Sequence, residues 1–556
     1  MKLFLSVISL VCWSTLVWGQ NTVGLLSYNP SQSFDGYNLI YPNNQPNVYL
    51  LNNCGEIVHV WEDETNFRPG NTAYLTEEGL LYKTKRDAVA NQDPIFAGGA
   101  GAMVEIRDWD NNLIYNFNLN DENFRLHHDM AITPEGTILA IAWELQTLED
   151  CEAAGRDVST LTQAKMWPDI IIEIDPTTDE IIWEWRAWDH LIQDFDSTKN
   201  NYGVIADHPE LIDVNYGRED GHPDWMHANA IDYNTEFDQI LLSVPYFDEV
   251  WIIDHSTTTE EAAGSFGGFS NRGGDLMYRW GNPFTYGQGT IDDKQFFFQH
   301  DAQWVDDFLE PTHPQYGKIA VFNNQFEADV SVASVITPPF VMYDQEYTFD
   351  DVNNVYLPET YDFNIAHPVD STDLWSTGLS SVQFLPNGNT LIMAGRFGYA
   401  FELTPDNEEI VWEYVTPFNR GLPATQGDIL VENNNLTFRF NRYPFDFTAF
   451  EGRTLEPMGF LELEPDEEFC SQLTSTTEIL NQEKFTVFPN PVAHTLTVEW
   501  DGMMKANVEL INLVGQSVYS ARKVSGGRLY IDVSRLETGI YFLSIDGEYA
   551  RKVVVE

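Results

Sequence analysis

One strand-opening motif recurs along the chain, and three of its copies carry a histidine at the same place. These copies contain His128 in HHDMAITPEG, His227 in DWMHANAIDY and His300 in FQHDAQWV. Asn71 and Ser380 share this register, because each lies eight residues before a turn glycine, as His128 does. Repetition of one strand position indicates a chain built from similar units that bury their apolar faces against one another.

A second apolar strand follows each of these strands after a turn rich in Asp, Asn or Pro, and it ends near a tryptophan. The pattern predicts antiparallel hairpins. About six such units lie between Gly36 and Tyr414, which favours a six-bladed β-propeller, because radial repetition leaves few exposed sheet edges. We expect the tryptophans to form core between the blades. They are Trp61, Trp183, Trp185, Trp280 and Trp412.

In a propeller the innermost strand of every blade lines the central channel, so equivalent positions converge on one axis. We therefore expect His128, His227 and His300 to meet. Asp129 and Asp301 each follow one of these histidines. Side chains alternate along a strand, so both aspartates should face the opposite way, into contacts between blades.

The length of 556 residues, with 43% hydrophobic and 14% aromatic side chains, suffices for one large domain and a smaller one. Residues 1–19 are predicted to be a secretory signal peptide, because a lysine precedes an apolar run and a small residue. Residues 20–464 form the predicted propeller, 465–484 a polar linker and 485–556 a small β-sandwich. Besides the cysteine in the signal, Cys54, Cys151 and Cys470 remain, so one disulfide is possible and its pairing stays open.

The formal net charge of −57 argues against nucleic acid and anionic membranes as partners, since both require a basic surface. An anionic substrate would need a local positive pocket, because charge repulsion is screened only beyond about 8–10 Å. No other segment is long and apolar enough to span a membrane.

The last seventy or so residues resemble the C-terminal sorting domain of type IX secretion. The resemblance is carried by FPNP at 488–491, NLVGQ at 512–516, LETGIY at 536–541 and KVVV at 552–555. It implies export across the outer membrane by the type IX machinery, usually with removal of the domain. We therefore expect the protein to pass through the periplasm and to be secreted or displayed at the cell surface.

Residues 35–455 resemble the bacterial arylsulfotransferase family, the aryl-sulfate sulfotransferases that use no nucleotide donor. The matching segments include HHDMAITPEG, DWMHANAIDYNTEFDQILLSV, GGDLMYRWGNP, QHDAQWV and SSVQFLPNGNTLIMAGRFGYAFEL. The resemblance implies that a channel histidine attacks the sulfur of an aryl sulfate, releases the phenol and passes the sulfuryl group to a second phenol. Donor and acceptor are thus the expected small-molecule partners, and no cofactor is expected.

Residue by residue, His227 matches the family's Trp-x-His-x-Asn motif and His300 its Gln-His motif. The resemblance leaves the nucleophile open, and His128 and His367 remain candidates. Family members carry an arginine after the segment that here reads FNNQFE, and Arg396 is a candidate replacement. We thus expect catalytic roles for His300, His227, His128 and Arg396.

Four further residues are predicted to bind substrate. Asn229 lies on the strand face of His227 and offers a neutral donor, and Arg279 offers an anion clamp. Trp225 could stack on the aryl ring of the donor, and His367 is the remaining histidine candidate.

Two other functions fit three converging histidines. Such a group resembles a three-histidine zinc or copper site with an open position. A secreted propeller can also be a non-catalytic binding or adhesive module. Histidine at three equivalent channel positions favours catalysis, since a pure binding propeller has no need of it.

Overall fold

The computed structural model describes residues 21–64, 68–86, 95, 97–99, 101–473 and most of 485–555, the gaps there being 501–505, 513–516, 525–526, 537 and 546–548. The predicted signal peptide and most of the predicted linker lie outside these residues. The described chain is almost entirely β-structure in antiparallel sheets, as the hairpin pattern predicted.

In the described part before residue 464, six large antiparallel sheets follow one another along the chain. The first has the order β35 (Phe440–Pro444), β2 (Gly36–Ile40), β3 (Val48–Leu51), β4 (Ile57–Trp61). The second has the order β5 (Arg68–Leu75), β6 (Leu81–Arg86), β7 (Met103–Arg107), β8 (Leu113–Asn118). The third has the order β9 (Phe124–Ile132), β10 (Ile138–Glu144), β13 (Asp169–Asp175), β14 (Glu180–Arg186).

The other three sheets repeat this plan. The fourth has the order β17 (Ala230–Asn234), β18 (Gln239–Val244), β19 (Glu249–Asp254), β20 (Tyr278–Trp280). The fifth has the order β21 (His300–Trp304), β22 (Ile319–Glu327), β23 (Val330–Ile336), β28 (Phe363–Ile365). The sixth has the order β29 (Ser381–Phe384), β30 (Thr390–Ala394), β31 (Tyr399–Leu403), β32 (Ile410–Val415), β1 (Gly24–Tyr28).

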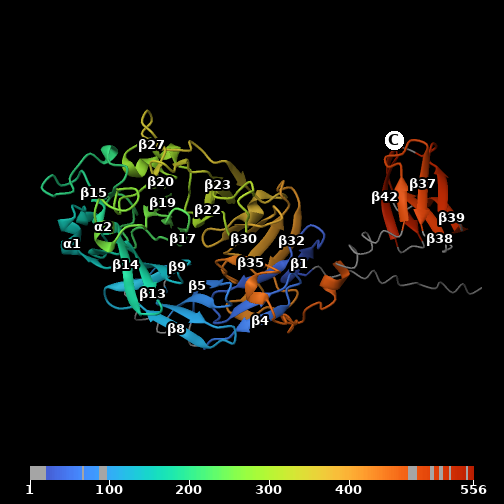
Figure 1. Cartoon of the computed structure of the whole chain (residues 1–556), viewed down its shortest axis with the longest axis horizontal. Helices are drawn as coiled ribbons and strands as arrows, with labels where there is room; N and C mark the ends of the chain where they lie inside the picture. Colours follow the sequence, from blue (N-terminus) through green and yellow to red (C-terminus); the bar gives the residue numbers. More distant parts are fainter. Residues whose placement is uncertain are drawn as a thin grey trace, which may run out of the picture.

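One edge strand of each sheet contacts the next sheet, and the series returns to its start. β5 contacts β9, β9 contacts β17 and β17 contacts β21. β21 then contacts β29, β29 contacts β35, and β2 contacts β5. Figure 1 shows the sheets arranged around the body in chain order, from β4 and β5 through β13 and β19 to β32. The repeated strand position therefore recurs on strands that meet one another.

Both ends of this region complete sheets begun elsewhere in the chain. β1 pairs with β32, and β35 pairs with β2. A disulfide joins Cys54 to Cys470, while Cys151 is free and buried. Cys470 also packs in the apolar core with neighbours from the first and sixth sheets, although it lies in the stretch predicted to be linker.

The tryptophans that end the hairpins are at most 5% exposed, as expected for core residues. Trp61 and Trp412 belong to clusters around the first sheet, and Trp183 and Trp185 pack with side chains of the fourth. Burial of each large ring removes apolar surface from water and holds neighbouring sheets together.

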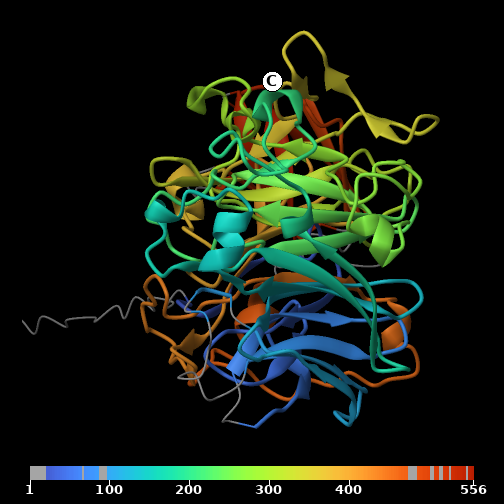
Figure 2. The same cartoon turned by 90° about the vertical axis from the view of Figure 1, so that its left-hand side faces the viewer.

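Short elements decorate the sheets. The helices are α1 (Leu148–Ala153) and α2 (Thr259–Ala262). Two-residue strands pair as β11 (Gln146–Thr147) with β12 (Lys165–Met166), β15 (Leu191–Ile192) with β16 (Ile212–Asp213), and β33 (Phe418–Asn419) with β34 (Leu422–Pro423). Figure 2 shows two more hairpins projecting from the body, β24 (Phe340–Val341) with β25 (Glu346–Tyr347) and β26 (Phe349–Asp350) with β27 (Val355–Tyr356).

Two further sheets form the C-terminal part (Figure 1). One has the order β36 (Phe485–Phe488), β37 (Thr495–Trp500), β40 (Arg528–Asp532). The other has the order β39 (Ser517–Val524), β38 (Ala506–Asn512), β41 (Gly539–Ile545), β42 (Tyr549–Val555). Side chains from both sheets share one apolar core. Among the described residues, no helix is long and apolar enough to cross a membrane.

Candidate functional site

The histidine-bearing strands are interrupted by bulges at the repeated position. In β9 the pairing with β10 jumps from Met130 to Leu126, and in β21 the pairing with β22 jumps from His300 to Gln303. His128 and His227 have φ angles of 50° and 60°, a left-handed backbone that residues other than glycine rarely adopt. Bulges re-aim side chains and occur next to functional sites.

The structure brings the three predicted histidines together. The ring centroids of His128 and His227 lie 4.5 Å apart at an interplanar angle of 77°. His300 lies close to both of these rings. A charge on His300 lowers the pKa of His128, and a charge on His227 lowers the pKa of His300. All three side chains are at most 7% exposed. The convergence that the repeat predicted is therefore observed.

His300 is fixed by an amide that defines its tautomer. Asn324 donates from Nδ2 to the backbone carbonyls of Ser376 and Leu379, at 2.9 and 3.1 Å. Its Oδ1 must therefore accept from His300 Nδ1, which lies 2.8 Å away. Burial lowers the pKa of His300 to about 3 despite this hydrogen bond, so the ring is neutral and its Nε2 carries a lone pair.

His227 is paired with a carboxylate. Its Nδ1 lies 2.7 Å from Asp224 Oδ2, which orients the ring and leaves Nε2 facing away from the carboxylate. Arg218 lies 3.8 Å from the same carboxylate and donates to the hydroxyl of Tyr246. The Tyr246 ring is 5.1 Å from that of His227. This arrangement fixes the orientation of the His227 ring and places an aromatic face beside it.

A fourth histidine, which the repeat did not indicate, supports His128. The Nδ1 atoms of His127 and His128 are 2.7 Å apart, and the His127 ring stacks on Trp143 at 3.9 Å. His127 Nε2 lies 3.1 Å from Asp169 Oδ1. Burial lowers the pKa of both histidines and raises that of Asp169, so burial favours the neutral form of all three groups.

Glycine packs directly against His128. Asn71, the first copy of the repeated position, donates to the carbonyl of Gly99, and the same carbonyl accepts from the backbone N–H of His128. A Cβ on Gly99 would lie 1.8 Å from His128 Nε2. Gly99 also has a φ of 68°, so only glycine fits this wall of the site.

Arg396 lies beside His300 and keeps a donor free. Its charge lowers the pKa of His300. Its Nη1 donates to Asn433 at 2.8 Å, whereas its buried Nε has no hydrogen-bond partner among the described residues. Ser380, the last copy of the repeat, holds the Arg396 turn by accepting from the backbone N–H of Gly395. The arrangement suits the holding of an anion next to His300.

Asp129 and Asp301 face away from the histidines, as the alternation predicted. Asp129 accepts from the backbone N–H of Ile231 in the next sheet at 3.1 Å. Asp301 likewise accepts from Val382 in the next sheet at 2.9 Å. Both carboxylates therefore join neighbouring sheets.

Three of the predicted substrate-binding side chains are committed elsewhere. Trp225 is 2% exposed, donates to the Tyr216 carbonyl and packs in the core, so its ring is not available for stacking on a substrate. Arg279 is fully buried and pairs with Glu249 at 2.6 Å, because a buried guanidinium needs a charge partner. Asn229 donates to the carbonyl of Gln299 at 2.8 Å, so it positions the residue before His300.

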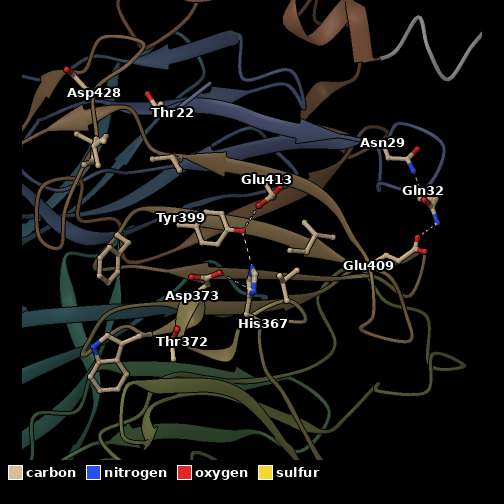
Figure 3. A pocket seen from close by; sticks show the side chains of 17 residues that line it. Thr22, Asn29, Gln32, His367, Thr372, Asp373, Tyr399, Glu409, Glu413 and Asp428 are labelled. Atoms are coloured by element: carbon tan, nitrogen blue, oxygen red, sulfur yellow. Dashed lines mark hydrogen bonds and ion pairs between the residues drawn. The ribbon is translucent and has the colours of Figure 1, made fainter. Parts of the chain in front are cut away.

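His367 lies away from the other histidines, on the wall of a separate cavity of about 1010 Å³ (Figure 3). Its Nε2 is 3.4 Å from the hydroxyl of Tyr399, which donates to Glu413 at 2.7 Å. Its Nδ1 accepts from the backbone N–H of Asp370. The structure therefore does not bring His367 to His128, His227 and His300.

No group of three or more histidine, cysteine, aspartate or glutamate side chains is arranged to hold a metal ion within the described ranges. The Nδ1 atoms of His227 and His300 face Asp224 and Asn324.

The sequence analysis did not single out His127 or Asn324, which support the site histidines, nor Arg439, which donates to Asp129 at 2.8 Å. His127 was visible as one half of a histidine doublet, and Asn324 as one half of an asparagine doublet in an apolar strand. Arg439 lies between Phe438 and Phe440, and a charged residue between two aromatic residues was the available signal that its side chain needs a buried partner.

Comparisons with known proteins agree with this arrangement. The family model described as arylsulfotransferase (ASST) matches residues 43–420, and the secretion system C-terminal sorting domain model matches residues 486–556. The second match confirms the predicted sorting domain, which indicates secretion or display at the cell surface. No curated protein matches the chain.

Two solved structures share general features with the chain. A protein of unknown function from Bacteroides caccae is 12% identical with a TM-score of 0.37, over 68% of this chain and 93% of its own. Dihydro-heme d1 dehydrogenase NirN in complex with DHE is 8% identical with a TM-score of 0.30, over 90% of this chain and 75% of its own. At these scores neither likeness carries an argument.

Proposed function

The chain belongs to the arylsulfotransferase family, and from that premise we propose that it transfers a sulfuryl group from an aryl sulfate to a phenol through a sulfohistidine on His300. The six sheets are the blades of a six-bladed propeller, and the histidines line its channel. The closed series of contacts between β5, β9, β17, β21, β29 and the β35–β2 sheet supports this geometry.

One observation carries the proposal. The Nδ1 atoms of His128, His227 and His300 are each held by a partner, and no described residue hydrogen-bonds their Nε2 atoms. Three Nε2 atoms therefore remain without a hydrogen-bond partner among the described residues, on side chains that are at most 7% exposed. Sulfuryl transfer requires this kind of positioning of donors and a nucleophile around one tetrahedral group.

In the first half-reaction, the Nε2 lone pair of neutral His300 attacks sulfur and the bond from sulfur to the phenolic oxygen breaks. His227, protonated beside Asp224, gives its Nε2 proton to the leaving oxygen, so a neutral phenol departs. Arg396 Nε donates to a sulfuryl oxygen. His128, whose ring is held through Nδ1 by His127, also donates from Nε2–H to a sulfuryl oxygen.

In the second half-reaction, neutral His227 removes the proton of the acceptor phenol while its oxygen attacks the sulfur. The nitrogen–sulfur bond to His300 breaks, and the new aryl sulfate leaves as an anion. The enzyme returns to neutral His300 and protonated His227. Net charge and protons balance across the two steps, so no cofactor is needed for this ping-pong cycle.

The aryl rings of donor and acceptor stack beside Tyr246 and Phe298. These rings are 5.4 Å apart, and each adjoins a site histidine, His227 at 5.1 Å and His300 at 5.8 Å. Both side chains are partly exposed, unlike Trp225. They take the stacking role that the sequence analysis gave to Trp225.

The test is the release of 4-nitrophenol from 4-nitrophenyl sulfate by the protein lacking residues 1–19, with and without added phenol. His300→Asn should lower kcat by at least about 10³-fold, because the nucleophile is lost. Intact-protein mass spectrometry without acceptor should show one added sulfuryl group on the wild type, and peptide mapping should place it on His300.

His313→Asn is the matched control, because His313 lies outside the histidine cluster. It should retain activity. A sulfuryl group mapped to another histidine would reject His300 as nucleophile, and a folded wild type without phenol-dependent turnover would favour the binding-module alternative.

A further inference from the structure

One arginine joins the two aspartates that follow His128 and His300. Arg439 donates from Nη2 to Asp129 Oδ2 at 2.8 Å and from Nη1 to Oδ1 at 3.3 Å. Its Nε lies 2.7 Å from Asp301 Oδ1. The arginine side chain is 11% exposed, and the carboxylates are 0% and 1% exposed. Arg439 lies directly before β35, so a segment remote in sequence reaches both histidine strands.

Each of these aspartates is anchored to more than the arginine. Tyr74 donates to Asp129 at 2.7 Å, in addition to the N–H of Ile231 in β17. Gln303 donates to Asp301 at 2.8 Å, in addition to the N–H of Val382 in β29. The carboxylates thus tie the third sheet to the fourth and the fifth to the sixth, and Arg439 ties the two pairs together.

We propose that Arg439 is a positioning residue for sulfuryl transfer, which fixes His128 relative to His300 by clamping the carboxylates of Asp129 and Asp301. The inference rests on the proposed function. His128 has a φ of 50° and Asp301 a φ of 58°, and such backbone persists only where neighbouring contacts hold it. Without the guanidinium, the two buried carboxyl groups would lose the contact that joins them, and the histidines would be free to move with their strands.

Arg439 also lines a second cavity. This cavity of about 530 Å³ is lined by Arg439, Asp301, Met130 and Ile231, among others, and by none of the three site histidines. Loss of the guanidinium would enlarge this cavity beside Asp301, which directly follows His300, and would admit water closer to the histidine strands.

The experiment compares wild type, Arg439→Lys and the triple variant Asp129→Asn/Asp301→Asn/Arg439→Met in the 4-nitrophenyl sulfate assay. Lysine keeps the charge but cannot reach both carboxylates as a planar fork. Arg439→Lys should lower kcat about 10- to 100-fold with little change in KM, because displaced reacting groups cost rate. The triple variant removes all three buried charges and should fold, yet keep the low kcat.

Arg442→Lys is the matched control. Arg442 lies three residues after Arg439, and it is likewise buried and paired with a carboxylate, that of Glu402. It should melt earlier than wild type and retain its kcat. The pH profile of kcat should shift in Arg439→Lys and not in this control.

A readout independent of turnover separates this inference from the proposed function. Diethyl pyrocarbonate should modify His128 and His300 several-fold faster in Arg439→Lys than in wild type, as quantified by peptide mass spectrometry. A wild type without sulfuryl transfer would refute the proposed function. The rate at which diethyl pyrocarbonate modifies His128 and His300 would still test whether Arg439 holds them in place. Wild-type kcat and histidine reactivity in folded Arg439→Lys, or full kcat in the triple variant, would overturn the positioning role.

Discussion

Acid should destabilise this protein through His300. The ring is 4% exposed, and burial lowers its pKa in the folded state to about 3. In the unfolded chain the pKa is about 6.5. Between these values the unfolded state binds a proton that the folded state does not, so the free energy of unfolding falls as the pH falls. The stability is fully present above about pH 6.5 and is lost progressively toward pH 3.

The size of this effect follows from the two pKa values. Protonation of the unfolded chain contributes a slope of up to about 1.4 kcal/mol per pH unit below pH 6.5. Between pH 7.5 and pH 5 the contribution of His300 alone is about 2 kcal/mol. Many carboxylates titrate in the same range, so the wild-type curve alone does not isolate this term.

The perturbation is therefore His300→Gln, which keeps an amide donor near Asn324 and removes the titration. Urea unfolding of wild type and variant, followed by tryptophan fluorescence, should be measured from pH 7.5 to pH 5. The variant should gain about 2 kcal/mol relative to wild type across this range. His494→Gln, at an exposed histidine, serves as control and should follow the wild type. Parallel curves for wild type and His300→Gln would refute the argument that His300 is neutral through burial.

Two further changes test the walls of the site. Asp224→Asn should lower kcat at least about 100-fold with a smaller effect on KM, because His227 loses the carboxylate that orients it. An unchanged kcat for a phenol that leaves slowly would contradict proton transfer by His227. Gly99→Ala should displace His128, because the new Cβ would lie 1.8 Å from its Nε2. The substitution should also add backbone strain, because Gly99 has a φ of 68°. A variant with the melting temperature and kcat of the wild type would contradict this prediction.

The repeat in the sequence was sufficient to predict that His128, His227 and His300 meet. Equivalent strand positions converge whenever similar sheets are arranged in a ring, so this prediction needed only the register. The orientation of Asp129 and Asp301 followed from strand alternation in the same way. These features depend on backbone periodicity, which a single sequence displays.

The side chains that complete the site could not be derived in that way. Trp225 and Arg279 were expected to face substrate, but Trp225 packs in the apolar core and Arg279 forms a buried ion pair with Glu249. Asn324 reaches His300 from β22, the neighbouring strand of the same sheet, and Arg439 reaches Asp129 and Asp301 from the segment before β35, which is remote in sequence. Long-range pairing of buried polar groups is the part of this fold that periodicity does not encode.

The chemistry of the site also explains why it is buried in so acidic a protein. A formal charge of −57 repels sulfate esters at long range, but that repulsion is screened over about 10 Å. In the proposed reaction, burial keeps His300 neutral and Arg396 supplies the local positive charge. The same burial lowers the pKa of His300 and so reduces stability in acid. A variant that exposes His300 to water should therefore regain stability in acid.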